Sequence, residues 1–560
     1  MNARVNPEFQ RGKTTRGFRV VLPRFVSPNL ELFNMTSGRS APTTFRLLLL
    51  LACVFIFAPC RLGYTQDASE KKASANQKTT RSSAEIFEEY QEKLEKLAKK
   101  CEERGMLLEA KVTRSYLYSE KEYFFNVPLL SHKQSLQELP SDASKEQQSW
   151  FAALRRLQTR YANETFSVAE QLGSSKKGYK IVACVLQTLY INPDHERARR
   201  FLGYSLYNGE WRSQWEIRNL EKGLVDDPKF GWLPEDHVEK YRQGQRYYRN
   251  QWISQAEEEK KILASSSGWR VDTEHFSILS RVSLERGVEI GRYLESYYQA
   301  WSRLFYPFIA NEKQWTARLF TDSAIVAKRH RVILYKNRAE YVRELRKYDR
   351  NASLSIGGYF PDLRCTFVYE PDPNNVDDAF ELLPLLAHEA THQLFNECNI
   401  PHSTRGKYDY SKLAQNANFW VAEGIAITAE TFKIDEGRNR TEMGGYQNVF
   451  RITDALESLF TDKSYIPLRE FAGMSRKAFQ SYEDLNLLYS QAAGMAFFLM
   501  FYNDGKYCNA FVSYLYTLYQ GIDAPDTLER LTGKSFEELD KEYLTFMKEI
   551  YEKTQNSKSM

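Results

Sequence analysis

An apolar segment interrupted by two histidines and a glutamate constrains the fold of this 560-residue chain most strongly. The segment reads LLPLLAHEATHQL and runs from Leu382 to Leu394. Residues four apart lie one above the other on a helix, so the imidazoles of His388 and His392 leave the same face. Glu389 follows the first histidine directly. The apolar neighbours predict a buried helix that directs both imidazoles at one point.

The same three residues form the H-E-x-x-H pattern, which carries a specific chemistry. Two imidazoles at this spacing bind one Zn²⁺, and Glu389 can reach a water in the open coordination position and act as general base. With 8 His in the chain, a chance match arises in about one such sequence per hundred. Zinc sites of this type need a third protein ligand, which gives a second test.

A carboxylate further along the chain is a candidate for this third ligand. Glu423 lies in the helix-type run NFWVAEGIAITAE, residues 418–430, among apolar neighbours. A carboxylate buried there without a partner would be costly, and coordination to a metal removes that cost. Glu430 lies two turns later on the same face, where it either orients a ligating histidine or remains a solvated or capping glutamate.

Two other residues are also candidates for the third ligand. His402 follows His392 by ten residues, and Asp409 lies in the polar stretch GKYDYSK. The H-E-x-x-H-x-x-G-x-x-H pattern would need a histidine after six residues and a glycine, and this chain has neither. Glu423 is therefore the preferred ligand.

The two segments together resemble the gluzincin clan of zinc metallopeptidases. In that clan H-E-x-x-H is followed by W-x-x-E-G-x-A, matched here by Trp420, Glu423, Gly424 and Ala426. The longer gap between the motifs is similar to that of the peptidase-MA-like families, many of them exported bacterial domains of unknown function. The resemblance covers roughly residues 270–550. It implies a thermolysin-like domain that binds Zn²⁺ through His388, His392 and Glu423, with Glu389 as general base.

The resemblance also implies a donor for the developing oxyanion. In aminopeptidase-like members a tyrosine from a later helix has this role. Tyr489 lies 66 residues after Glu423 and opens the helix-type run LLYSQAAGMAFFLMFY. Tyr489 is therefore the expected second catalytic residue, with Tyr446 as the alternative.

The net charge of +5 comes from the N-terminus. Residues 1–65 hold nine Lys or Arg and two acids, a net of +7, which leaves 77 − 9 = 68 bases against 72 − 2 = 70 acids beyond them. The run LLLLLACVFIFAPC, residues 47–60, is short of the roughly twenty apolar residues that span a bilayer. We expect a secretory signal that starts at Met35 and is cleaved near residues 60–66, so the protein would be secreted or periplasmic, or anchored if the leader is retained.

The remaining pattern predicts an α+β protein. Helical periodicity runs from Ala84 to about residue 265 and includes one hairpin, broken at Asn192-Pro193, that is either tetratricopeptide-like or ordinary. Strands are expected in TEHFSILS, at residues 331–335 and at 365–370; the last is either an edge strand beside the cleft or an ordinary strand, and Gly357-Gly358 indicates a turn. The expected segments are a leader (1–65), a linker (66–82), a helical region (83–266), an α+β subdomain (267–376) and a helical zinc-site subdomain (377–552).

These observations predict an exported zinc-dependent metallopeptidase that acts on a peptide or protein substrate. The alternative is a non-catalytic scaffold in which the helical region binds a partner and the zinc site is structural or vestigial. No nucleic-acid-binding motif is present, and the basic charge is confined to the leader, so nucleic acid is not an expected partner. Membrane contact is expected only through a retained leader.

Overall fold

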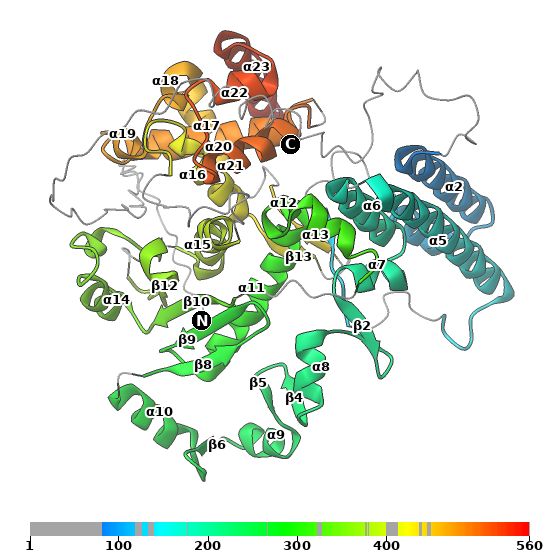
Figure 1. The fold of residues 1–560 in the computed structure, drawn as a ribbon, viewed down its shortest axis with the longest axis horizontal. Helices are drawn as coiled ribbons and strands as arrows, with labels where there is room; N and C mark the ends of the chain where they lie inside the picture. Colours follow the sequence, from blue (N-terminus) through cyan, green and yellow to red (C-terminus); the bar gives the residue numbers. More distant parts are fainter. Residues whose placement is uncertain are drawn as a thin grey trace, which may run out of the picture.

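The computed structural model describes twelve stretches of the chain: residues 81–117, 126–132, 139–175, 177–265, 267–321, 328–375, 378, 380–398, 413–435, 440–444, 450–503 and 505–558 (Figure 1). The predicted signal sequence and its start and cleavage sites lie outside these residues, as does the linker up to residue 80. The same holds for His402, Asp409 and Tyr446.

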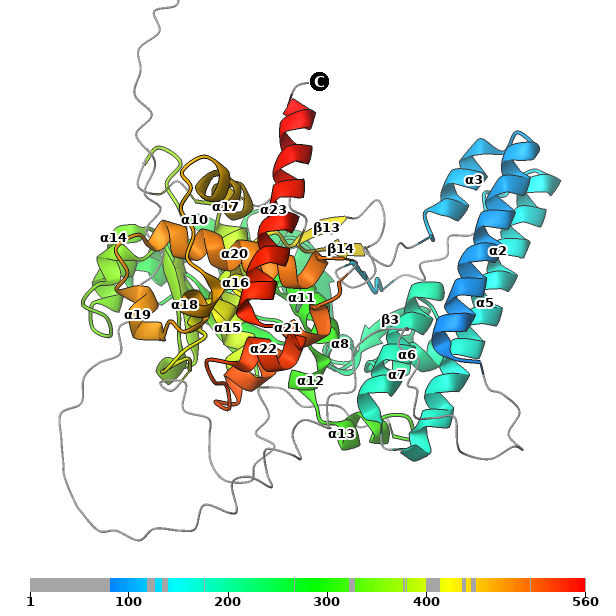
Figure 2. The same cartoon turned by 90° about the horizontal axis from the view of Figure 1, so that it is seen from above.

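Helices form the N-terminal part of the described chain, as the periodicity predicts. They are α2 (Ser83–Glu103), α3 (Leu107–Arg114), α5 (Lys145–Leu172), α6 (Gly178–Ile191) and α7 (Glu196–Phe201). Capping boxes at Ser82 and Ser144 start the two longest of these helices, because a hydroxyl and a side chain three residues later satisfy the free amides of the first turn. Helices α2 and α5 lie side by side (Figure 2), and the Tyr90 and Tyr161 rings meet between them at 5.7 Å.

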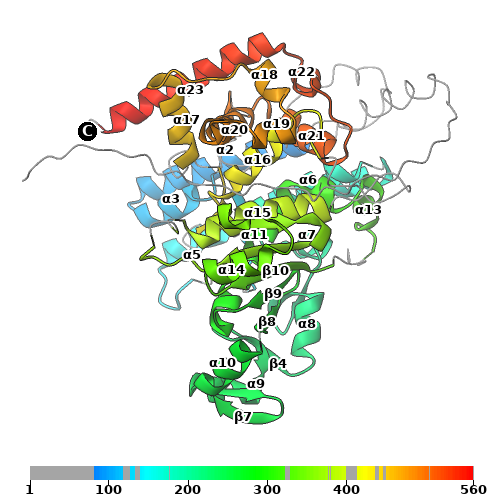
Figure 3. The same cartoon turned by 90° about the vertical axis from the view of Figure 1, so that its left-hand side faces the viewer.

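Three hairpin–helix units follow, and here the expectation of continued helix is wrong. The units are β2 (Tyr204–Tyr207), β3 (Glu210–Ser213) and α8 (Gln214–Leu220); β4 (Leu224–Asp227), β5 (Gly231–Pro234) and α9 (Glu235–Arg242); and β6 (Gln245–Tyr248), β7 (Gln251–Ser254) and α10 (Gln255–Ala264). Asn208-Gly209 takes positive φ at both positions, which suits a tight two-residue hairpin turn. The second and third units extend beyond strand β8 (Figure 3).

A five-stranded sheet supports the centre of the molecule. Its strands are β8 (Trp269–Asp272), β9 (Phe276–Ser280), β10 (His330–Tyr335), β11 (Gly357–Phe360) and β12 (Cys365–Tyr369), in the order β11-β12-β10-β9-β8. Strands β9, β10 and β12 are parallel, and the two edge strands are antiparallel to their neighbours. The segment 365–370 thus forms an interior strand, and the edge strand beside it is β11.

Gly357-Gly358 belongs to strand β11, so the expected turn at this position is wrong. The glycine is needed for a close approach. A Cβ on Gly357 would lie 3.1 Å from Leu385 Cδ2, on the helix that carries the two histidines. The strand can pack tightly against that helix because this position has no side chain.

Helices cover the sheet and complete the C-terminal half. The long helix α11 (Leu284–Leu304) links β9 to β10 together with α12 (Tyr306–Ile309) and α13 (Glu312–Ala317), and α14 (Arg338–Leu345) precedes β11. The others are α15 (Leu382–Glu397), α16 (Phe419–Ala429), α17 (Phe450–Phe460), α18 (Leu468–Ala472), α19 (Arg476–Gln480), α20 (Leu485–Phe501), α21 (Cys508–Tyr519), α22 (Thr527–Thr532) and α23 (Phe536–Lys558). One hydrophobic core joins the sheet to these helices.

A small second sheet ties the N-terminal part to this half. Strand β1 (Asn126–Pro128) pairs with β14 (Arg440–Glu442), which pairs in turn with β13 (Lys433–Asp435). The described structure therefore has the expected mixed α+β class. Across the described residues, no helix has both the length and the apolar character needed to cross a bilayer.

Candidate metal centre

Helices α15 and α16 bring the three predicted ligands together. His388 and His392 lie one turn apart on α15, and Glu423 lies on α16, which packs against it. Gly424 permits a close approach on the other side of α16, since a Cβ there would lie 2.7 Å from the carbonyl oxygen of Ala492 on α20. The ligand helices are thus held between the sheet and α20.

The ligand atoms of these three residues face one point. The Nε2 atoms of His388 and His392 are 3.3 Å apart, and Glu423 Oε2 lies 3.7 Å from the first and 3.8 Å from the second. Tetrahedral Zn²⁺ with bonds of about 2.0–2.2 Å places neighbouring ligand atoms roughly 3.3–3.5 Å apart. The geometry thus fits a zinc ion after movements of a few tenths of an ångström.

Burial makes the same arrangement costly without a cation. His388, His392 and Glu423 are 2%, 1% and 2% exposed. The second carboxylate oxygen of Glu423, Oε1, is buried and has no hydrogen-bond partner. A buried carboxylate that lacks partners loses its hydration without replacement. These donor atoms match the nitrogen and oxygen ligands that zinc prefers.

Electrostatics within the site favour positive charge. Burial alone would raise the pKa of Glu423, but the neighbouring imidazoles lower it to about 2. Burial would likewise lower the pKa of His388, but hydrogen bonds to Glu423 and Glu430 raise it to about 10. The carboxylates therefore attract a cation to this point, either a proton or a metal ion.

Glu430 contacts the ring of His388 on the side away from the other candidate ligands, as its position on the helix suggests. Its Oε1 lies 2.7 Å from His388 Nδ1. An ionised carboxylate can only accept, so Nδ1 carries a proton, and Nε2 is the nitrogen that would bind a metal ion in place of its own proton. Such a partner fixes both the ring orientation and the tautomer of a ligating histidine.

Glu389 is fully buried beside the ligands. Its Oε2 accepts the backbone N–H of Tyr359 at 2.7 Å, and its Oε1 has no hydrogen-bond partner. Burial raises the pKa of Glu389, and His388, His392 and the Tyr359 amide only partly oppose this. One oxygen is therefore held by strand β11, and the other is buried without a hydrogen bond.

Tyr489 is buried on α20. Burial, together with the negative charges of Glu423 and Glu389, raises the pKa of Tyr489 well above its ordinary value, so the phenol keeps its proton and remains a donor. Its ring packs edge-on against Phe479 at 5.4 Å. The guanidinium of Arg451 lies 5.9 Å from the ring centre.

Two positioning contacts were not foreseen from the sequence. The Tyr359 amide is a backbone group, which no side-chain pattern reveals. The hydroxyls of Tyr297 on α11 and Thr391 on α15 are 2.5 Å apart and join the histidine helix to its neighbour. A threonine inside the H-E-x-x-H pattern was the one available signal for this second contact.

No known family model matches this chain, and none of the curated proteins gives a significant match.

Proposed function

We propose that the protein is a zinc-dependent metallopeptidase of the gluzincin type, with a thermolysin-like arrangement of sheet and helices. The observation that carries the proposal is the convergence of His388, His392 and Glu423, whose ligand atoms all lie within 4.8 Å of one another. Glu389 adjoins them with an unpartnered carboxylate oxygen. Zinc bound here would acidify a water and polarise a carbonyl oxygen.

The side chains around the ligands supply the other requirements of hydrolysis. Glu389 has a raised pKa, which suits a base that takes a proton from water and then passes it to the leaving amine. Tyr489 keeps its proton and can donate to an oxygen that gains negative charge. Glu430 holds His388 in the tautomer that ligation requires.

A peptide is the substrate class that the surroundings favour. Strand β11 is the edge of the five-stranded sheet, and the amide of its Tyr359 contacts the base. An extended peptide can add to a sheet edge through main-chain hydrogen bonds, whatever its sequence. Such pairing would lay a peptide bond alongside Glu389.

Replacement of the base separates catalysis from metal binding. We expect Glu389→Gln to retain about one zinc per chain and to lower cleavage of a quenched fluorescent peptide library about 10²–10⁴-fold, because the amide cannot accept the proton. Glu381→Gln is the matched control, since Glu381 is exposed at the start of the same helix. Full activity of Glu389→Gln would reject the mechanism, and purified protein without zinc would reject the metal site.

The proposed donor can be tested in the same assay. We expect Tyr489→Phe to lower kcat about 10–10³-fold with little change in KM, because the hydroxyl acts on charge that develops only in the transition state. Zinc content should stay unchanged. A kcat equal to that of the parent protein would remove Tyr489 from the mechanism.

Export is part of the same proposal. It is supported by the basic and apolar leader, which has the layout of a secretory signal. N-terminal sequencing of protein recovered from the culture medium or periplasm should begin near residues 60–66. A mature N-terminus at or before Met35 in such a preparation would contradict it.

A further inference from the structure

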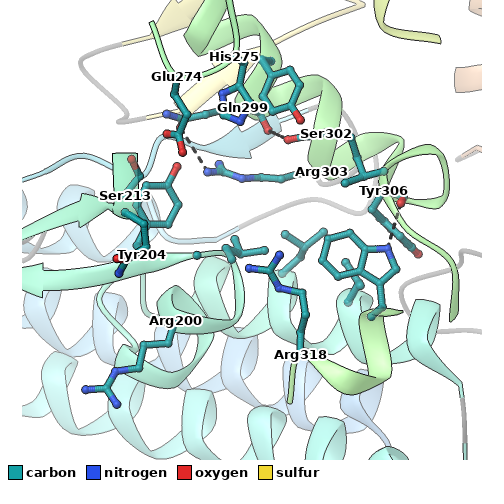
Figure 4. Close-up of a pocket in the computed structure, with 18 of the residues that line it drawn as sticks. Arg200, Tyr204, Ser213, Glu274, His275, Gln299, Ser302, Arg303, Tyr306 and Arg318 are labelled. Atoms are coloured by element: carbon teal, nitrogen blue, oxygen red, sulfur yellow. Dashed lines mark hydrogen bonds between the residues drawn. The ribbon is translucent and has the colours of Figure 1, made fainter. Parts of the chain in front are cut away.

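A partly open cavity lies away from the metal centre, where the N-terminal helices meet the C-terminal half. The cavity has a volume of about 170 Å³ and is lined by residues of α6, α7, the first hairpin, α11, α12 and α13 (Figure 4). Cavities of roughly 150 Å³ accommodate a benzene-sized guest. The space thus suits a molecule of about six non-hydrogen atoms.

A buried arginine without an acidic partner faces this cavity. Arg303 on α11 is 8% exposed, and its guanidinium donates to the Pro128 carbonyl at 2.6 Å and to Gln299 Oε1 at 3.3 Å. It forms no ion pair with any carboxylate of the described chain. Burial lowers the pKa of Arg303, but arginine stays charged in proteins. A buried charge of this kind calls for a counter-ion.

The surroundings add positive charge. Arg199, which is fully buried, lies close enough to Arg303 that burial and the positive charge of Arg303 help to lower its pKa to about 10. The nearest acid to Arg199 is Asp194, at 3.6 Å. Asp194 is thus an acidic neighbour of Arg199 and not of Arg303. Glu274 also lines the cavity, and burial raises the pKa of its carboxyl group.

Further donors converge on the same space. Figure 4 shows the side chains of Arg303, Arg318 and Tyr204 directed toward it, whereas the guanidinium of Arg200 turns away. Arg200 instead pairs with Glu196 at 2.6 Å. The cavity thus combines two guanidinium groups and a phenol, an arrangement that binds oxyanions.

Apolar side chains complete the wall. They come from α6, α12 and α13 and include Val182, Leu186, Ile309 and Trp315. These residues offer no hydrogen bonds to a fully hydrated ion, but they can cover a hydrocarbon portion. A carboxylate with a short hydrocarbon chain fits both halves of the lining better than a phosphate does.

We propose that this junction cavity binds a small organic carboxylate, with its charged end between Arg303 and Arg318 and its hydrocarbon end against α6 and α13. The bound anion supplies the counter-charge that Arg303 lacks. Because the lining comes from both the N-terminal helices and α11, the ligand also bridges these two parts of the protein. The proposal is independent of the peptidase activity.

Calorimetric titration of the intact zinc-loaded protein tests whether the cavity binds a carboxylate. The ionic strength is held constant with sodium chloride. Butyrate should bind with a Kd on the order of 1 mM. Butyramide, the neutral isostere, and inorganic phosphate should bind at least about tenfold more weakly. Equal binding of butyramide would overturn the role of charge, and tighter binding of phosphate would overturn the choice of a carboxylate.

Variants locate the binding within the cavity. Arg303→Gln and Arg318→Gln should each weaken butyrate binding about tenfold or more, and Arg200→Gln, the matched control from the same lining, should stay within about twofold. Arg303 also holds the Pro128 carbonyl, so circular dichroism must show that each variant is folded. Arg318 has no such contact with Pro128. Parent-like binding by a folded Arg318→Gln would overturn the site even if Arg303→Gln does not fold.

Discussion

Two buried histidines in different regions of the molecule are tuned in opposite directions. His195, in the N-terminal helical region, is 9% exposed, and burial lowers its pKa to about 4, with the positive charge of Arg197 adding to the effect. His388, in the metal region, is 2% exposed, yet Glu423 and Glu430 raise its pKa to about 10. Burial alone therefore does not decide what a histidine can do. The carboxylates around it do.

The hydrogen bonds of the two residues show the same contrast. His195 Nδ1 accepts the backbone N–H of Ala198 and so caps α7, and its Nε2 lies 3.1 Å from Asn163 Oδ1. Both nitrogens are used within the fold. In His388, Nδ1 contacts Glu430, whereas Nε2 lies 3.3 Å from His392 Nε2 and 3.7 Å from Glu423 Oε2. Its Nε2 points to the other ligand atoms, which is the arrangement of a binding site.

Removal of the Glu423 carboxylate should make the surroundings of His388 resemble those of His195. This change should have the largest effect on zinc binding. We expect Glu423→Gln to weaken zinc binding by at least about a hundredfold, because loss of a direct ligand costs more than loss of an outer partner. Competition with a chromogenic chelator measures the affinity. Glu381→Gln should bind zinc as the parent protein does, and unchanged affinity in Glu423→Gln would exclude Glu423 as the third ligand.

The helical region should respond to acid through His195. Its pKa is about 4 in the folded protein and about 6.5 unfolded, so the unfolded chain binds the extra proton between these values. Stability is therefore lost as pH falls from about 6.5 towards 4, by about 2 kcal/mol at pH 5 and by about 3 kcal/mol at the lower end.

His195→Asn sharpens this prediction, since asparagine also caps helices well but does not titrate. The variant should be about 1 kcal/mol less stable than the parent at pH 7.5, through loss of the bond to Asn163, and should lack the acid-dependent loss. Hydrogen exchange of α6 and α7 amides at pH 7.5 and 5 reports the difference. Parallel pH dependence in the two proteins would show that His195 is not the responsible group.

Loss of the outer carboxylate should weaken zinc binding less than loss of Glu423 does. We expect Glu430→Gln to weaken zinc binding about 10–100-fold, because the amide no longer stabilises the proton on His388 Nδ1. Glu442→Gln is the control, a change in β14 at a carboxylate that pairs with Arg440 and Lys433. If both variants bind zinc equally well, Glu430 does not orient the ligand.

The candidate metal site could be predicted from the sequence, whereas the role of His195 could not. His388, His392 and Glu389 are neighbours on one helix, so their spacing alone predicts their geometry. Glu423 could be inferred because a carboxylate in an apolar helix needs a partner. The lone His195 carries no such pattern, and neither its cap nor its altered pKa was predictable.

The fold was predictable where burial repeats with a helical or strand period. The three hairpins were missed because their signal lies in turn residues such as Asn208-Gly209 rather than in apolar spacing. Gly357-Gly358 was interpreted as a turn, although the strand needs a glycine in order to approach α15. The carboxylate cavity was hidden as well, since Arg303 and Arg318 meet residues of α6 and the first hairpin only through tertiary packing.

The pairing of β1 with β14 has a consequence for the order in which the protein can fold. Thr441 donates to the carbonyl of Val127, a contact between residues 314 positions apart. At about 5–20 residues per second, a ribosome needs roughly 15–60 s to synthesise the intervening chain. The three residues of β1 must wait that long for their partner strand, so this sheet forms only after α15 and α16, the helices that carry the three candidate ligands, have been made.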